Sequence, residues 1–498
     1  MGTLCRQKLN VDIPLVLIFK HKTIAKISGL VKEKQEIIIP HIENKQRYPL
    51  SFEQEQLLFI EEMGKGGSAY HIPYFSVLER DADLSLLLNA INQLANRHSI
   101  LKSVYRFEDE DKYEYEQVIL NGDIPVKHEQ AESEEALLAA VETCIATPFN
   151  LSQEAGMRIH TWSVGDDTYL LILFHHIAFD GWSERIFMFE LAQVYQDLIK
   201  GKASTLTETT INYGDYAYWQ RNLFSEDKLG NFYDFWHTQL TGISPLTLPL
   251  DFPRPPFSDH AGKNYRIDFA SEFFHELKKV TKEEGTTLHT IFLSAFFLTL
   301  SSVCEQNDIV IGMPSDNRDS SQVQEIVGLF TNTLALRSKI RPDVTLSDYI
   351  AEVHQHVAQA KSHQQLPFSK VVEMLGIKPD LSINPIYQVL FSLVDSRVPE
   401  QYKQRLPIDF NTFHIENKRQ KITQYSPAKV DLSLELIIQG EHIYGGFIYA
   451  TSLMKESTVA VIAERFKEIM TALTHEREND LQTVLAQVIC QNLKSESV

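Results

Sequence analysis

Two adjacent histidines, an aspartate and a glycine stand close together in residues 175–181, and groups of these types are suited to acyl transfer. The segment reads His175-His176-Ile177-Ala178-Phe179-Asp180-Gly181. An amine or hydroxyl that attacks a thioester loses a proton while the carbonyl oxygen gains negative charge. Histidine moves protons near neutral pH because its ordinary pKa is about 6.5, and a backbone N–H stabilises an oxyanion. The side chains therefore indicate an acyl-transfer site.

The flanking segments predict how this motif is held. Residues 169–174 form a continuous apolar run, which is typical of a strand buried on both faces. Apolar residues then recur at helical spacing, at Phe187, Leu191, Val194 and Leu198. Ser183 is the expected N-cap of that helix. The motif then lies in a strand-to-helix loop, where Gly181 allows close backbone approach to a ligand near the positive helix end.

The residue types alone also fit other interpretations. Histidines beside a buried strand are often hydrogen-bonded core residues without a chemical role, and the spacing leaves that interpretation open. Zinc binding by the histidines and Asp180 is disfavoured, because adjacent residues after a strand point to opposite faces. We therefore expect no metal.

Further segments around the motif follow one another in a family-specific order. They are residues 50–58, 96–102, 213–220, 311–318, 327–334, 363–368 and 385–392. Together with the histidine motif, these segments make the chain resemble the condensation domains of nonribosomal peptide synthetases, whose signature is HHxxxDG. The resemblance extends from Tyr48 to about Leu473. It departs from the family pattern in three places: the usual tryptophan is missing around Leu58, Lys102 stands for arginine, and Asn317 stands for glycine.

The resemblance implies an α/β fold of two chloramphenicol-acetyltransferase-like lobes, which form a V-shaped pseudo-dimer with a central tunnel. It implies an acyltransferase that forms an amide bond between a carrier-bound acyl, aminoacyl or peptidyl thioester and the amine of an aminoacyl group on an acceptor carrier. Both substrates arrive on the phosphopantetheine of carrier proteins. No covalently bound cofactor is expected.

The resemblance also assigns roles to individual residues. His176 is expected at the reacting carbon, as a base or as a positioning group, and the N–H of Gly181 is the candidate oxyanion donor. His175 supports the loop, and Asp180 pairs with Arg318. Two residues are expected to line the reaction site, Trp182 and Asn332.

The subtype follows from two short segments. Residues 67–73 and 180–183 resemble domains that join an L-configured donor to an L-configured acceptor. The glycine after Asp180 disfavours an epimerase, and the two histidines disfavour a heterocyclising relative, which carries doubled aspartates. The class of donor stays open.

The chain length predicts two domain-sized cores within 498 residues. We expect a C-terminal remnant of a carrier domain at residues 1–31, a linker at 32–47, and the N-terminal lobe at 48–225. The C-terminal lobe follows at 226–480, and a polar tail or linker at 481–498. The sequence contains no glycine-rich loop of the kind that binds phosphates, so we expect the chain not to activate an amino acid itself. The expected partners are therefore donor and acceptor carriers and an adenylation domain of a parent synthetase.

Composition excludes several classes of protein. A net charge of −19 argues against nucleic acid and anionic membranes as partners. The four cysteines lack metal or disulfide spacing, which favours a reducing cytoplasm. The apolar run Thr290–Leu300 is about half the length of a membrane span, so we interpret it as a core helix.

Two alternatives to a carrier-dependent enzyme remain. One is a non-catalytic docking module for carriers or tailoring enzymes, or a gene fragment, which the carrier remnant favours. The other is a free-standing transferase that acts on a soluble amine or alcohol. The intact His175, His176, Asp180 and Gly181 favour the enzyme.

Overall fold

The computed structural model describes most of the chain from residue 38 to residue 487. The described residues are 23, 38–43, 46–63, 66–109, 114–224, 230–257, 259–378, 380, 382–396, 406 and 426–487. The predicted carrier remnant at residues 1–31 lies outside them, apart from Thr23. Cys5 and Cys490 also lie outside them, whereas Cys144 and Cys304 are free thiols.

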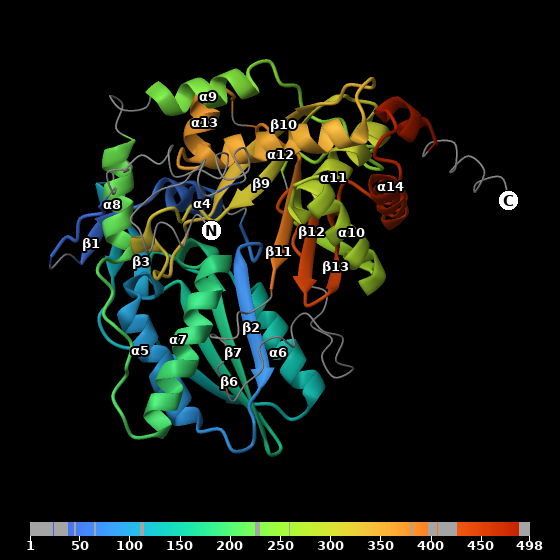
Figure 1. Ribbon diagram of the computed structural model, residues 1–498. Helices are drawn as coiled ribbons and strands as arrows, with labels where there is room; N and C mark the ends of the chain where they lie inside the picture. Colours follow the sequence, from blue (N-terminus) through green and yellow to red (C-terminus); the bar gives the residue numbers. More distant parts are fainter. Residues whose placement is uncertain are drawn as a thin grey trace.

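The N-terminal lobe alternates strands and helices around the predicted buried strand (Figure 1). Its elements are β1 (Arg47–Pro49), α4 (Phe52–Glu62), β2 (His71–Val77), α5 (Leu84–Arg97), η1 (Ser99–Lys102), β3 (Ser103–Asp109), β4 (Glu114–Ile119), β5 (Val126–Gln130), α6 (Glu134–Ala146), β6 (Met157–Val164), β7 (Asp167–His175), η2 (His176–Ala178), α7 (Gly181–Ile199) and α8 (Tyr213–Leu223). One sheet has the order β2-β7-β6-β5 and another the order β1-β4-β3.

The C-terminal lobe is built on a larger sheet with the order β10-β9-β11-β12-β13-β8. Its elements are α9 (Gly230–Leu240), β8 (Gly262–Phe269), α10 (Ser271–Glu283), α11 (Leu288–Cys304), β9 (Asp308–Ser315), η4 (Ser321–Val323), β10 (Asn332–Lys339), α12 (Leu346–Ser362), α13 (Phe368–Met374), β11 (Val389–Asp395), β12 (Leu432–Gln439), β13 (His442–Ala450) and α14 (Glu456–His475). The sheet is mixed, because β11 runs parallel to both β12 and β9.

Helix α11 contains the apolar run that was expected to form a core helix. Residues from Thr290 to Ser301 are buried or nearly so, and the helix contacts α14 and α12. An all-round apolar helix is stable only where every side is covered. Within the described residues, no single helix is long and apolar enough to cross a membrane. The pair α10 and α11 passes that test only together, with a bend of 99°.

Two features of the lobes differ from the boundaries expected from the sequence. Residues 316–331, here called the crossover segment, belong to the C-terminal lobe by sequence, yet Val327 and Phe330 are buried in the N-terminal core. The expected polar tail begins too early, because Leu481 and Val484 are buried in the C-terminal core. Because Leu481 and Val484 are three residues apart, they lie on the same side of a helical turn. An isolated β-bridge pairs Asp480 with Thr345.

Candidate active site

Strand β7 positions the histidine motif. It lies between β2 and β6, and its residues from Leu170 to Phe174 are completely buried, as the apolar run predicts. The strand ends at His175, and a single turn of 3-10 helix leads to α7. The two histidines have different surroundings: His175 is completely buried, whereas His176 is partly exposed. The predicted position of the motif between a strand and a helix is therefore confirmed.

His175 is held by hydrogen bonds on both ring nitrogens. Its Nδ1 accepts the backbone N–H of Ile177 at 3.2 Å. The other nitrogen, Nε2, then carries the hydrogen and donates it to the Glu61 carboxylate at 3.3 Å. The rings of His71 and Phe149 meet the His175 ring edge to face. These contacts support the structural role predicted for His175.

The turn that precedes β2 covers the motif. The carbonyl of Tyr70 accepts the backbone N–H of His176 at 2.8 Å. Gly66, at the start of this turn, leaves room for Glu61, because a Cβ at this position would overlap the Glu61 carboxylate. The turn therefore contacts both helix α4, through Glu61, and the histidine motif, through His176.

His176 is the motif side chain that remains available for chemistry. Its Nδ1 is buried and has no hydrogen-bond partner among the described residues. Burial, together with the positive charge of Lys429, lowers the pKa of His176 to about 4, although the negative charge of Asp180 acts in the opposite direction. The imidazole is therefore neutral at pH 7 and able to accept a proton.

Asp180, not Ser183, is the N-cap of α7. The expectation for Ser183 is wrong: Asp180 Oδ1 accepts the backbone N–H of Ser183 at 2.8 Å and its hydroxyl at 2.7 Å. Both residue types cap helices. Asp180 takes this role because the helix already begins at Gly181, which puts Ser183 at its third position.

Asp180 forms the predicted ion pair with Arg318, and both side chains are buried. The Arg318 guanidinium lies 3.0 Å from Asp180 Oδ1, and Oδ2 also accepts the backbone N–H of Phe330 at 3.0 Å. Arg318 further donates to the carbonyls of Val323 and Ile326, both at 2.6 Å. Asp180 thus joins the start of α7 to the crossover segment.

Other contacts fasten the crossover segment to the same helix. Trp182 donates its indole N–H to the carbonyl of Gln324 at 3.0 Å. Asn317 has a φ of 49°, in the left-handed region that favours glycine and tolerates asparagine. The backbone conformation explains why asparagine replaces the family's glycine here.

The predicted site residues are only partly brought together. Gly181 is exposed at the first position of α7, where the backbone N–H has no partner inside the helix. Asn332 is buried, and its side chain donates to the carbonyls of Gln364 and Leu366 at 2.8 and 2.7 Å. These bonds hold the loop before α13. A lining role for Asn332 and Trp182 stays a prediction.

Three groups around the motif were not predicted from the sequence: Glu61, Tyr70 and Lys429. Tyr70 lies within a segment that indicated only the subtype, and the other two belong to no motif. They come from distant parts of the chain, so spacing along the sequence gives no signal for them.

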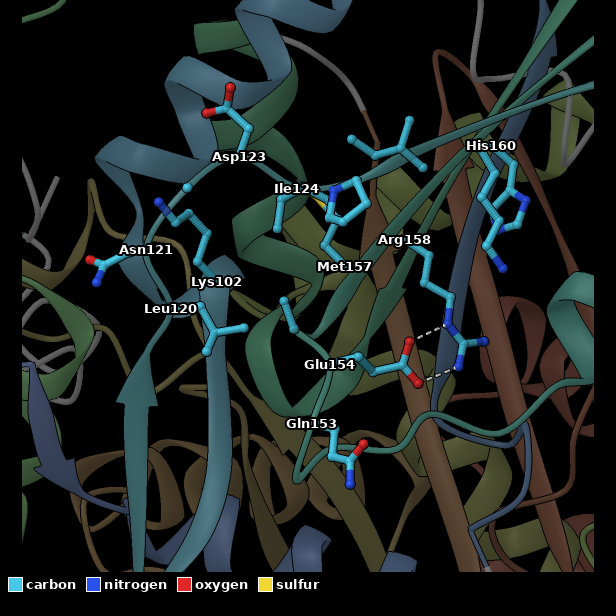
Figure 2. Close-up of a pocket in the computed structure, with 15 residues that line it drawn as sticks. Lys102, Leu120, Asn121, Asp123, Ile124, Gln153, Glu154, Met157, Arg158 and His160 are labelled. Atoms are coloured by element: carbon cyan, nitrogen blue, oxygen red, sulfur yellow. Dashed lines mark hydrogen bonds and ion pairs between the residues drawn. The ribbon is translucent and has the colours of Figure 1, made fainter.

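A separate cavity of about 360 Å³ opens in the N-terminal lobe, between residues 120–127 and 153–160 (Figure 2). Figure 2 shows Arg158 and Glu154 pointing toward each other, and their ion pair measures 2.7 Å. Arg158 also donates to two backbone carbonyls, so its donors are largely used. None of the predicted site residues lines this cavity. Among the described residues, no cluster of side chains is suited to hold a metal ion.

Known proteins resemble this chain along most of its length. The model of the condensation domain family matches residues 44–487. Gramicidin S synthase 2 of Aneurinibacillus migulanus is 30% identical over 476 residues, which cover 94% of this chain but only 10% of that protein. The chain therefore spans a small part of the length of such relatives.

Solved structures share the fold at low sequence identity. The X-domain from teicoplanin biosynthesis, solved in complex with OxyB, has a TM-score of 0.79 at 20% identity, covering 91% of this chain and 98% of its own. A four-domain nonribosomal peptide synthetase bound to AMP and glycine has a TM-score of 0.75 at 21% identity, over 88% of this chain and 34% of its own. The expected two-lobed fold is confirmed, and the chain belongs to the condensation domain family of nonribosomal peptide synthetases.

Proposed function

We propose that this chain forms peptide bonds by transferring an acyl, aminoacyl or peptidyl group from a carrier-bound thioester to the amine of an aminoacyl group on a second carrier. The observation that carries the proposal is the state of His176. Its ring is neutral at pH 7 and partly exposed, whereas His175 and Asp180 are fully engaged in hydrogen bonds.

In the proposed reaction, the acceptor amine attacks the thioester carbon. A C–N bond forms, the C–S bond breaks, and the thiolate leaves on the donor carrier. His176 takes the proton that the nitrogen loses, or orients the amine through a hydrogen bond. The N–H of Gly181 donates to the oxyanion, at the positive end of α7. Holding both substrates in place lowers the barrier by roughly 7 to 11 kcal/mol at best.

The partners in this proposal are a donor carrier, an acceptor carrier and the adenylation domain of a parent synthetase in the cytoplasm. Phosphopantetheine carries both substrates, and the protein itself needs no covalent cofactor. Residues 67–73 and 180–183 favour an L-configured donor and an L-configured acceptor. Epimerase and heterocyclising activities are not proposed.

The test supplies a donor-loaded carrier and an aminoacyl-loaded acceptor carrier, and follows the acceptor's pantetheine arm by mass spectrometry. We expect an elongated thioester with the parent chain and a much smaller yield with His176→Ala. If the mass never changes with any matched carrier pair while the folded chain still binds the carriers, a docking module is the better account. If the product appears on a free amine or alcohol, the chain is a soluble-acceptor transferase.

A further inference from the structure

A lysine of the C-terminal lobe lies against the turn that holds His176. Lys429 stands just before β12, and its Nζ lies 5.3 Å from the centre of the Tyr70 ring. The carbonyl of Tyr70 accepts the backbone N–H of His176 at 2.8 Å. One residue therefore connects the lysine of one lobe to the histidine of the other.

The backbone next to Lys429 is held in place. Ala428 donates its N–H to the carbonyl of His260 at 3.1 Å, and the His260 ring bonds to the Ala428 carbonyl at 3.0 Å. The His260 ring also meets the Tyr70 ring edge to face, with 6.3 Å between their centres. These contacts fix the point from which the lysine side chain extends.

Lys429 and His176 share an unusual combination of properties. Desolvation lowers the pKa of both groups, although His176 is partly exposed and Lys429 is exposed at the surface. Lys429 and His176 both contact Tyr70, one through the ring and the other through the backbone.

We propose that Lys429 is a positioning residue for the condensation step: it holds the Tyr70 turn against the second lobe and places a positive charge beside His176. The inference rests on the proposed function, because it assigns a role to Lys429 in that reaction. The role is electrostatic and acts through His176.

The charges around His176 support this role. After burial, the positive charge of Lys429 is the largest influence that lowers the pKa of His176; His175 acts in the same direction, and Asp180 opposes them. Burial lowers the pKa of Lys429 as well, and Glu435 opposes that change. Two positive charges repel, so a charged Lys429 keeps the imidazole neutral over a wider pH range, in the form that accepts a proton.

The test measures the protonation of His176 directly. Diethyl pyrocarbonate reacts with neutral imidazole, so peptide mass spectrometry of its modification rate at each pH gives a midpoint for His176. We expect this midpoint to stay at the parental pH in Lys429→Arg, to rise in Lys429→Met and to rise further in Lys429→Glu. Lys455→Met is the matched control, because Lys455 also lies 5.5 Å from an aromatic ring, that of Phe252, but away from His176. Its midpoint should equal that of the parent.

Activity gives an independent second measurement, because a protonated His176 cannot accept the proton of the amine. We expect the pH below which kcat falls to rise in Lys429→Met at an unchanged melting temperature, and Lys429→Arg to restore the parental pH. An unchanged midpoint in folded Lys429→Met and Lys429→Glu would overturn the proposal; if the methionine variant does not fold, Lys429→Gln takes its place. Should the parent transfer no acyl group, the proposed function fails, but the midpoint series still tests the action of Lys429 on His176.

Discussion

The two histidines of the motif differ because the end of a β-strand sends adjacent side chains to opposite sides. His175 points inward, where Glu61 and the N–H of Ile177 use both of its nitrogens. His176 is partly exposed, and its backbone N–H rather than its ring is hydrogen-bonded to Tyr70. The proposed structural and chemical roles are thus assigned to two residues that are adjacent in the sequence.

Replacing each histidine with alanine should therefore give different results. Positioned acid–base groups contribute about 100-fold to 10,000-fold to a rate, so His176→Ala should lose that much condensation activity at a parental melting temperature. His175→Ala should lower the melting temperature, because Glu61 and the Ile177 N–H lose a buried partner. Carrier-based turnover and thermal melts of both variants provide the check. Intact condensation by both variants would refute the catalytic role.

At the scale of elements, Asp180 joins the N-terminus of α7 to the crossover segment. One carboxylate satisfies a helix N–H, a backbone N–H of the crossover segment and the Arg318 guanidinium. The crossover segment belongs to the C-terminal lobe by sequence but packs in the N-terminal core. The ion pair therefore stabilises the site by holding the lobes together.

Removing Asp180 should accordingly destabilise the fold. Breaking a buried pair from one side costs on the order of 3 to 5 kcal/mol, so Asp180→Ala should lose stability as well as activity. Asp308 offers the control: its pair with Arg337 is close at 2.6 Å, but its side chain is 44% exposed. Asp308→Ala should cost about 1 kcal/mol or less. Urea unfolding measures both changes; an inactive Asp180→Ala with parental stability would contradict the structural role.

Substitution of Gly181, unlike that of Asp180, should affect activity without affecting stability. It begins α7 with an ordinary φ, and a Cβ there meets no atom of the described residues within 4 Å. Gly181→Leu should therefore fold with near-parental stability and yet abolish turnover, because the side chain fills the path of a pantetheine arm. Thermal melts and the carrier assay test the two parts separately. Normal turnover by this variant would exclude close substrate approach at this residue.

At the scale of the whole molecule, the sequence predicted local features better than long-range ones. The apolar run of β7 and the spacing in α7 reflect local burial, so both elements were predictable. The pairing of Asp180 with Arg318 came from the family resemblance. The N-cap of α7 was predicted three residues too late, because aspartate and serine are equally good caps in sequence. Glu61 and Lys429 reach the site only through the tertiary fold, which no local pattern encodes.

The whole molecule should also lose stability in mild acid. Burial is the chief cause that lowers the pKa of His71 and His176 to about 4 and that of His289 to about 3. In the unfolded chain these groups titrate near 6.5. Between about pH 6.5 and 4 the unfolded chain therefore binds more protons, so their contribution to stability is complete above that range and is lost as the pH falls. Glu53 acts in the opposite direction, because burial raises its pKa to about 7.

A single substitution isolates one of these contributions. His71 is buried and bonds to the carbonyl of Ile145 at 2.6 Å. In His71→Gln the side-chain amide still donates to that carbonyl, but the titrating group is gone. We expect urea midpoints measured at about pH 7 and about pH 5 to differ less in this variant than in the parent. If the urea midpoints of His71→Gln and of the parent fell equally between the two pH values, the prediction that His71 contributes to the loss of stability in acid would be wrong.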